Sequence, residues 1–410
     1  MVIVLKRGVL VLEPENTGSE AVDVTPKEFG VRTLAQEYGG GAFTVSGDVV
    51  YFANYDDQRL YKQSISSLDV PPVPLTPDYN GPVVSYADGI LDARFNRFIS
   101  VREDRRESSL NPPTTIVSIA LGSKDVQEPE VLVSGSDFYA FPRLDPKGER
   151  IAWIQWNHPN MPWDKTELWV PCSDIYKRVC VAGYDPSLVE SPTEPKWSSD
   201  GELFFVTDRE NGFWNLHKWI EYENKVVSVY SLEAEFTRPL WTFGINSYEF
   251  VQSTKQRNLI ACGYRLSLLH CRQKGKSYLG IIDVQGSKLT VIDIPFTDLN
   301  NITSGNDCLF LEGASEVHPS SVAKVIFDDD KSKAVDFNIV WSSSPDSLKY
   351  SSYISKPEFI EFPTEVSGQN AYAYFYPPSN PDFQASEEEK PPHLNAEYCG
   401  LGSSTRTLLA

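Results

Sequence analysis

The stretch that decides the fold is residues 143–153, which read Arg-Leu-Asp-Pro-Lys-Gly-Glu-Arg-Ile-Ala-Trp. Pro146 fixes φ at about −65° and Gly148 supplies the positive φ that a tight reversal needs, so the chain is predicted to turn back here as a β-hairpin. The same device recurs at turns near Gly47, Asn96, Gly148, Gly201, Gln256 and Gly305. Successive turns are separated by 49, 52, 53, 55 and 49 residues, which is an internal repeat.

Each period of this repeat holds two hairpins, because a second strand signal follows each turn after a polar excursion. A four-stranded sheet that buries its faces only against its neighbours is the blade of a β-propeller. A β-sandwich, the alternative, expects turn signals every ~8–12 residues without this longer period. We therefore predict an all-β chain, a β-propeller, with six full blades at residues 37–77, 86–134, 138–182, 193–238, 245–294 and 300–342.

Both ends of the repeat are irregular. Residues 2–24 resemble the outer half of one more blade, whose first half would precede residue 1, so an incomplete first blade is expected. We assign residues 1–343 to the propeller, 344–376 to a linker with the first strands of another domain, and 377–410 to a polar tail that is expected to be disordered. The segment Leu266–Arg272 is apolar at its centre, at a place where the other predicted blades have polar residues. An insertion in this blade is one interpretation, and it is left open.

Composition narrows the function classes. The 410 residues include 37 basic and 56 acidic ones, a net charge of −19, which disfavours nucleic acid and anionic membrane surfaces as partners. No apolar run approaches the roughly 18 residues of a membrane span, and no secretion signal is recognisable. The six cysteines form no Cys-x-x-Cys pair; Cys172 and Cys180 could cross a hairpin, but reduced thiols are the preferred interpretation. The predicted location is the cytoplasm, with organellar import of a longer form as the open alternative.

The sequence predicts no cofactor, no metal and no catalytic residue. It contains no Gly-x-Ser-x-Gly, no phosphate loop with lysine and no His-Glu-x-x-His, and its five histidines are scattered. The run Gly39-Gly40-Gly41 could cradle an anion, but no helix is expected to follow it, so a close backbone crossing is favoured. Residues 328–333, Asp-Asp-Asp-Lys-Ser-Lys, are interpreted as a solvated turn.

Short motifs suggest a family. They are Glu-Tyr-Gly-Gly-Gly at 37–41, Asn-Met-Pro-Trp-Asp at 160–164 with Glu-Leu-Trp at 167–169, Gly-Phe-Trp-Asn-Leu at 212–216, and Tyr-Pro-Pro and Lys-Pro-Pro at 376–378 and 390–392. With these motifs the chain resembles, over about residues 8–392, the propeller half of the prolyl oligopeptidase family of serine peptidases. The resemblance is to the acylaminoacyl and dipeptidyl peptidase branch, and above all to its plant members.

The resemblance implies a function without implying a catalytic site. In that family a seven-bladed propeller caps an α/β-hydrolase domain with a Ser-His-Asp triad and admits only short peptides. Here residues 393–400, His-Leu-Asn-Ala-Glu-Tyr-Cys-Gly, stand where the family continues with an apolar strand and an oxyanion loop. We therefore expect a propeller that gates short peptides, truncated before its hydrolase domain and inactive alone. The predicted peptide-contacting residues are Trp163, Asp164, Phe213 and Trp214.

Two other function classes stay open. The chain could be a propeller that binds a protein or peptide without any enzymatic role. A propeller enzyme with its own polar pocket is the third and least favoured class. The sequence gives no prediction of oligomeric state.

Overall fold

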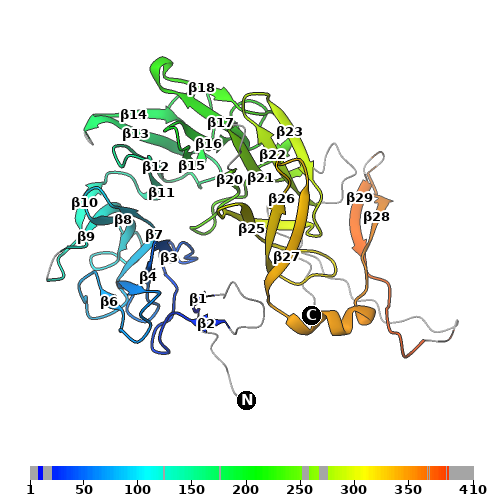
Figure 1. Cartoon of the computed structure of the whole chain (residues 1–410). Coiled ribbons are helices and arrows are strands. Elements are labelled where there is room, and N and C mark those ends of the chain that lie inside the picture. Colours follow the sequence, from blue (N-terminus) through cyan, green and yellow to red (C-terminus); the bar gives the residue numbers. More distant parts are fainter. Residues whose placement is uncertain are drawn as a thin grey trace. The chain divides into compact units, whose positions relative to one another are not determined.

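A computed structural model of the chain describes residues 8–12, 21–122, 125–174, 177–251, 258–266, 276–366, 368, 370–384 and 386. Their regular structure is antiparallel β-sheet apart from two 3-10 helices, η1 (Glu221–Glu223) and η2 (Pro345–Tyr353) (Figure 1). Neither helix is long and apolar enough to cross a membrane. The chain divides into two compact units, Met1–Leu232 with Pro239–Ile245, and Glu233–Arg238 with Asn246–Ala410.

The first unit contains four successive four-stranded sheets, each formed by strands that are consecutive in the sequence. A short ladder, β1 (Val11–Leu12) with β2 (Val22–Asp23), precedes them. The sheets are β3 (Phe43–Ser46), β4 (Val49–Ala53), β5 (Leu60–Ser64) and β6 (Val73–Pro74); β7 (Val84–Asp92), β8 (Arg97–Asp104), β9 (Thr114–Ala120) and β10 (Glu130–Val133); β11 (Phe138–Leu144), β12 (Ile151–Trp156), β13 (Glu167–Asp174) and β14 (Lys177–Ala182); and β15 (Thr193–Trp197), β16 (Leu203–Thr207), β17 (Asn215–Ile220) and β18 (Lys225–Ser228).

The described residues of the second unit form a five-stranded sheet, a four-stranded sheet and a separate hairpin. The first sheet has β19 (Ala234–Glu235) and β20 (Tyr248–Val251), which both pair with β21 (Leu259–Leu266), followed by β22 (Ser277–Asp283) and β23 (Lys288–Ile292). The second comprises β24 (Asp298–Ser304), β25 (Cys308–Ala314), β26 (Ser321–Phe327) and β27 (Ala334–Ser342). The hairpin pairs β28 (Glu358–Pro363) with β29 (Asn370–Phe375).

Among the described residues, five antiparallel sheets of four consecutive strands, and a sixth in which β19 and β20 share the place of the first strand, confirm the predicted β-propeller and exclude a sandwich of two large sheets. The central strands are the most apolar, as expected: every residue of β12 and of β16 is buried. The turns at Gly47, Asn96, Gly148 and Gly201 have positive φ values of 57°, 48°, 63° and 78°. The turn at residue 305 closes instead through the Gly305 N–H, which donates to the Cys308 carbonyl at 2.8 Å. The turn expected near residue 256 lies outside the described residues.

One predicted blade boundary is wrong. The fourth blade ends with β18 at Ser228 instead of residue 238, and the fifth begins with β19 at Ala234 instead of residue 245. The cause is that the first strand of the fifth sheet is interrupted: β19 and β20 pair with different parts of β21, and the chain between them leaves the sheet. Within that excursion, Pro239–Ile245 belongs to the first unit. The expected insertion at Leu266–Arg272 begins at the last residue of β21, and the rest of it lies outside the described residues.

A bulge in the first strand of several sheets is a feature that the sequence analysis missed. The register shifts between Ala87 and Ile90, between Ala140 and Arg143, between Thr193 and Lys196, and in the second unit between Leu299 and Ile302. The bulges in the first unit place Asp88, Phe141 and Glu194 at positive φ, 53 residues apart. Each of these three residues is buried. A bulge bends its strand and redirects a side chain. Its recurrence at equal spacing shows that it is a repeated feature of the first strands.

Candidate peptide-contacting surface

The loop between β12 and β13 carries two of the predicted residues, Trp163 and Asp164. A turn forms here because the Asp164 N–H donates to the Met161 carbonyl and Asp164 Oδ2 accepts the Met161 N–H, both at 2.9 Å. The start of the loop is held by Asp137, whose Oδ2 accepts hydrogen bonds from the N–H and Nδ1 of His158 at 2.9 Å. These hydrogen bonds hold the Asp137 pKa below its ordinary value. Trp163 is half-buried and Asp164 is exposed.

Trp163 does not stand alone. Its ring lies 4.3 Å from that of Trp241, at an interplanar angle of 41°, and the Trp241 ring meets that of Tyr38 edge-on at 5.8 Å. Tyr38 is 64% exposed, and Trp241 and Met161 are each 44% exposed. We call Tyr38, Trp163 and Trp241 the aromatic cluster. Its members come from three segments of the first unit that are distant in the sequence.

A close backbone crossing positions two members of the cluster. The Phe243 N–H donates to the Gly39 carbonyl at 2.8 Å, and Gly40 forms a parallel bridge with Phe243. A Cβ on Gly40 would lie 2.2 Å from the Phe243 carbonyl oxygen, so only glycine fits at this position. The favoured interpretation of the glycine run, a close crossing instead of an anion cradle, is therefore confirmed. The crossing holds Tyr38 and Trp241 near each other.

The same segment has a constrained backbone. Gln36 and Glu37 have φ values of 50° and 64°, which side-chain-bearing residues rarely adopt. The Gln36 N–H donates to the buried Glu103 carboxylate at 3.0 Å, which helps to impose this conformation. Strained residues cluster at functional sites, and here the strain presents Glu37 and Tyr38 to solvent.

The other two predicted residues, Phe213 and Trp214, lie in the loop between β16 and β17. Trp214 is half-buried, and its Nε1 donates to Ser191 Oγ at 2.9 Å. Phe213 is also half-buried, and its N–H donates to Asn211 Oδ1 at 3.0 Å. The ring contact of Trp163 is with Trp241, so the structure does not bring the two predicted pairs into contact. Trp214 is held within its own sheet.

Buried charges support the loop of Phe213 and Trp214. The Glu190 carboxylate accepts hydrogen bonds from the Gly183 N–H at 2.7 Å and from Thr207 Oγ1 at 2.9 Å, and pairs with Arg209 at 3.3 Å. His217, fully buried beneath, donates from Nδ1 to the Asn215 carbonyl at 2.9 Å. Its Nε2 has no hydrogen-bond partner, and Glu210 Oε1 lies 3.7 Å away. Burial lowers the His217 pKa, so this imidazole is a neutral packing group at physiological pH.

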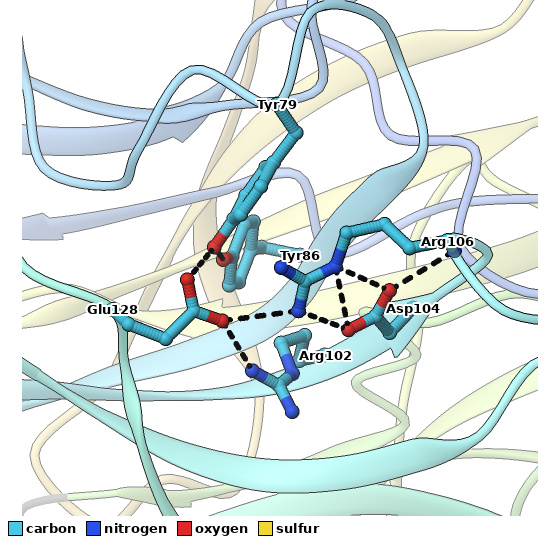
Figure 2. A network of polar contacts seen from close by, with 6 residues as sticks. All are labelled: Tyr79, Tyr86, Arg102, Asp104, Arg106 and Glu128. Atoms are coloured by element: carbon cyan, nitrogen blue, oxygen red, sulfur yellow. Dashed lines mark hydrogen bonds and ion pairs between the residues drawn. The ribbon is translucent and has the colours of Figure 1, made fainter.

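A polar network crosses one face of the sheet β7–β10 (Figure 2). Arg106 makes a bidentate pair with Asp104, with contacts of 2.5 to 3.1 Å, and Glu128 Oε1 accepts from Arg102 Nη1 at 3.2 Å and from Arg106 Nη2 at 3.1 Å. Tyr79 donates to Glu128 Oε2 at 2.8 Å. Burial would raise the Asp104 pKa, but the hydrogen bonds from Arg106 outweigh it and lower that pKa. Two guanidinium groups face two carboxylates, so the network is balanced in charge and is structural.

Two tyrosines and two free cysteines of the first and second units are poor nucleophiles at neutral pH. Burial, together with the Glu128 carboxylate, raises the pKa of Tyr79 to about 12, and burial raises the Tyr86 pKa. Burial also raises the pKa of the free thiol of Cys180 to about 12 and raises that of Cys262. In the described part of the chain no group of three His, Cys, Asp or Glu residues could hold a metal ion.

In the second unit a shallow hollow, open to solvent, lies beside β21 and β24. Arg265 lines it, but its guanidinium is already bonded to Ser277 Oγ and to the Asp298 carboxylate. Its charge is therefore compensated within the protein. The aromatic cluster of the first unit is the better candidate for a binding surface, because its rings are exposed.

No protein-family model and no curated protein matches the chain. Among solved structures, a puromycin-hydrolysing peptidase of Mycobacterium tuberculosis has a TM-score of 0.76 and 27% identity over 92% of this chain and 56% of that chain. A puromycin hydrolase structure has a TM-score of 0.77 and 24% identity over 94% and 57%. Prolyl oligopeptidase B from Galerina marginata shares the fold, with a TM-score of 0.56 and 12% identity over 85% and 46%.

The chain therefore spans a little over half the length of the first two structures. Its successive four-stranded sheets agree with these likenesses. In fold, the chain is a β-propeller of the kind that puromycin-hydrolysing peptidases and prolyl oligopeptidases contain.

Proposed function

We propose that the chain is the substrate-gating propeller of a serine peptidase of the prolyl oligopeptidase family, in its acylaminoacyl and dipeptidyl peptidase branch. The observation that supports this most is the 27% identity to a puromycin-hydrolysing peptidase over 92% of the chain. The propeller contacts short peptides and selects them by size. In that family the chemistry belongs to a hydrolase domain, and we propose that the 410 residues of this chain are inactive by themselves.

The extent of the match supports the proposed domain plan. Residues 1–343 make up about 84% of the 410 residues, whereas the match covers 92% of the chain, so part of it lies beyond residue 343. The hairpin β28–β29 lies in this part. We propose that residues 344–376 are a linker with the first strands of the hydrolase domain. The predicted tail, residues 377–410, lies largely outside the described residues.

The peptide contacts are proposed for Trp163 and Asp164 first, and for Phe213 and Trp214 second. Trp163 belongs to the exposed aromatic cluster, where ring faces can pack on a peptide. Trp214 is held by Ser191, so its contribution is a fixed wall instead of an adaptable contact. Aromatic residues at the centre of an interface commonly provide most of the binding energy.

Two assays on the purified chain test the proposal. The chain should take up no fluorophosphonate label and hydrolyse no acylated or free aminoacyl chromogenic substrate, while blocked peptides of five to ten residues quench its tryptophan fluorescence. The variant W163A should weaken this peptide binding about tenfold, the range expected for losing one interfacial aromatic anchor. Turnover that follows the protein through gel filtration would refute the proposed inactivity.

The alternative is a binding propeller without an enzymatic role. The size of the ligands that bind distinguishes it from a gating propeller. A gating propeller binds short peptides and not the same sequence inside a folded protein. Equal or tighter binding to the folded protein would favour the alternative.

A further inference from the structure

Within the first unit, arginine guanidinium groups lie over several aromatic rings. The guanidinium of Arg32 lies 5.2 Å from the centre of the Tyr55 ring, that of Arg150 lies 4.4 Å from Trp197, and that of Arg178 lies 5.0 Å from Trp169. A cation over a ring face is attracted by the electron density of that face. The chain therefore uses this pairing repeatedly on its own aromatic residues.

The aromatic cluster has no such partner. Within the described residues no lysine or arginine lies over the rings of Tyr38, Trp163 or Trp241, although Tyr38 is 64% exposed and Trp241 44%. Lys165, two residues after Trp163, is half-buried and does not cover either indole. The rings of Tyr38 and Trp241 are therefore accessible to a cation from outside the chain.

Two exposed carboxylates are sequence neighbours of these rings. Glu37 directly precedes Tyr38 and is exposed, and its carboxylate has no hydrogen bond or ion pair among the described residues. Asp164 directly follows Trp163 and is exposed, with one carboxylate oxygen accepting the Met161 N–H. The chain as a whole has a net charge of −19. A ligand that satisfies both the rings and the acids is a flat or compact organic cation.

We infer that the aromatic cluster, with Glu37 and Asp164, binds the side chain of an arginine or lysine in a short peptide. The inference rests on the proposed function, since it names the class of peptide that the propeller selects. Arginine fits best, because its planar guanidinium stacks on an indole or phenol ring while donating hydrogen bonds to a carboxylate. A cation–π contact at an exposed site is worth a factor of about two to five in affinity, and a partly desolvated one more.

The test compares two blocked peptides, acetyl-Ala-Ala-Arg-Ala-Ala-amide and the same peptide with citrulline in place of arginine. Citrulline has nearly the shape of arginine without its charge. Titration calorimetry and tryptophan fluorescence should show that the arginine peptide binds about tenfold more tightly, and that raising the salt concentration removes most of this difference. The variants E37Q and Y38A should each weaken binding of the arginine peptide at least threefold more than they weaken binding of the citrulline peptide.

The matched controls are Y222A and E223Q. Tyr222 is 87% exposed and is followed by a glutamate, but it belongs to η1 and has no ring contact among the described residues. These variants should bind both peptides as the parent chain does. Trp241 and Trp163 are left unchanged in the first round because they report the fluorescence signal, and Y38A alters only the most exposed ring.

The other possible outcomes contradict the inference, and each has a different meaning. Equal affinity for the arginine and citrulline peptides overturns it but leaves peptide gating intact. No binding of either peptide overturns the proposed function as well. A preference for arginine that survives both E37Q and Y38A places the cation elsewhere. Tighter binding of the citrulline peptide once its amino terminus is unblocked shows that the α-ammonium group is the cation recognised.

Discussion

At the scale of single residues, position 40 requires glycine for two reasons, a positive φ and a close contact that leaves no room for a Cβ. Its φ is +87°, and a Cβ would lie 2.2 Å from the Phe243 carbonyl oxygen. We expect the variant G40A to lose about 3 kcal/mol of unfolding free energy, since a positive φ costs about 1–2 kcal/mol and a forced clash about as much again. Urea denaturation followed by tryptophan fluorescence measures this loss.

Gly47 provides the control for this prediction. Its φ is +57°, and a Cβ there would meet nothing within 4 Å. The variant G47A should therefore lose only the conformational part, about 1 kcal/mol. If both variants lost the same free energy, the crossing of residues 39–41 by Phe243 would not constrain the fold.

His217 predicts a pH dependence of stability. Burial lowers its pKa in the folded chain below the unfolded value of about 6.5, so below that pH the unfolded chain binds more protons than the folded one. Stability contributed by the neutral imidazole is complete above about pH 6.5 and falls as the pH decreases, by at most about 1.4 kcal/mol per pH unit. Glu210, Arg209 and Glu190 are the charged groups around it.

The measurement is the free energy of unfolding between pH 8 and pH 5.5 for the parent chain and for H217Q. At pH 8 the difference between them reports only packing. We expect the two curves to converge as the pH falls, because the variant lacks the proton uptake on unfolding. Curves that stay parallel would show that His217 does not couple folding to protonation.

At the scale of elements, the bulge in β7 links two neighbouring sheets. Asp88 Oδ2 accepts the Phe141 N–H at 2.6 Å, its Oδ1 accepts from Arg143 Nη2 at 2.8 Å, and its own N–H donates to the Gly41 carbonyl at 2.8 Å. The carboxylate and the backbone N–H of Asp88 therefore both form hydrogen bonds, which connect this strand to β11 and to the residues just before β3. Asp88 is 5% exposed, so little solvent screens these bonds.

The variant D88N tests this link without disturbing the backbone, since asparagine tolerates the positive φ of 54° at this position. We expect a loss of about 2 kcal/mol in unfolding free energy, the usual value of a buried hydrogen bond to a charged group. The control E149Q removes the exposed pair between Glu149 and Arg94, where the side chains are 54% and 49% exposed, and should cost less than about 0.5 kcal/mol. Equal effects would mean that Asp88 is not a structural link.

At the scale of the whole molecule, the sequence predicts what repeats locally and misses what depends on distant contacts. The turn at Asp145–Gly148 and the apolar strand β12 after it are determined by residues close together in the sequence. The period of the blades could therefore be predicted from the sequence. The sequence predicted Trp163 as a peptide-contacting loop residue, but its partner Trp241 is 78 residues away. Trp241 lies where the first strand of the fifth sheet is interrupted, and nothing in its local sequence announces that excursion.

The bulges at Asp88, Phe141 and Glu194 were missed for a different reason. Their spacing is regular, but the three side chains are an acid, an aromatic ring and an acid, so no shared residue type marks the position. The glycine run at residues 39–41, unlike the bulges, is marked by its residue type. Three consecutive glycines indicated a close backbone approach, and only the identity of the crossing residue had to come from the structure.

Stability is also predicted to be uneven over the molecule. Every residue of β12 and β16 is buried in the core of the first unit, whereas the hairpin β28–β29 pairs only with itself and exposes Ile360, Phe362 and Phe375 by 40% or more. An isolated two-stranded hairpin is at best marginally stable in water, so its amides open without unfolding the rest. We expect hydrogen exchange at residues 359–363 and 370–375 to be about a thousandfold faster than in β12, a difference of about 4 kcal/mol in opening free energy. The strand β27 is the internal comparison, because it is similarly exposed but pairs along its length with β26. Its hydrogen-bonded amides should exchange at an intermediate rate, and protection in the hairpin equal to that of β27 would show that the hairpin is held by more than its own ladder.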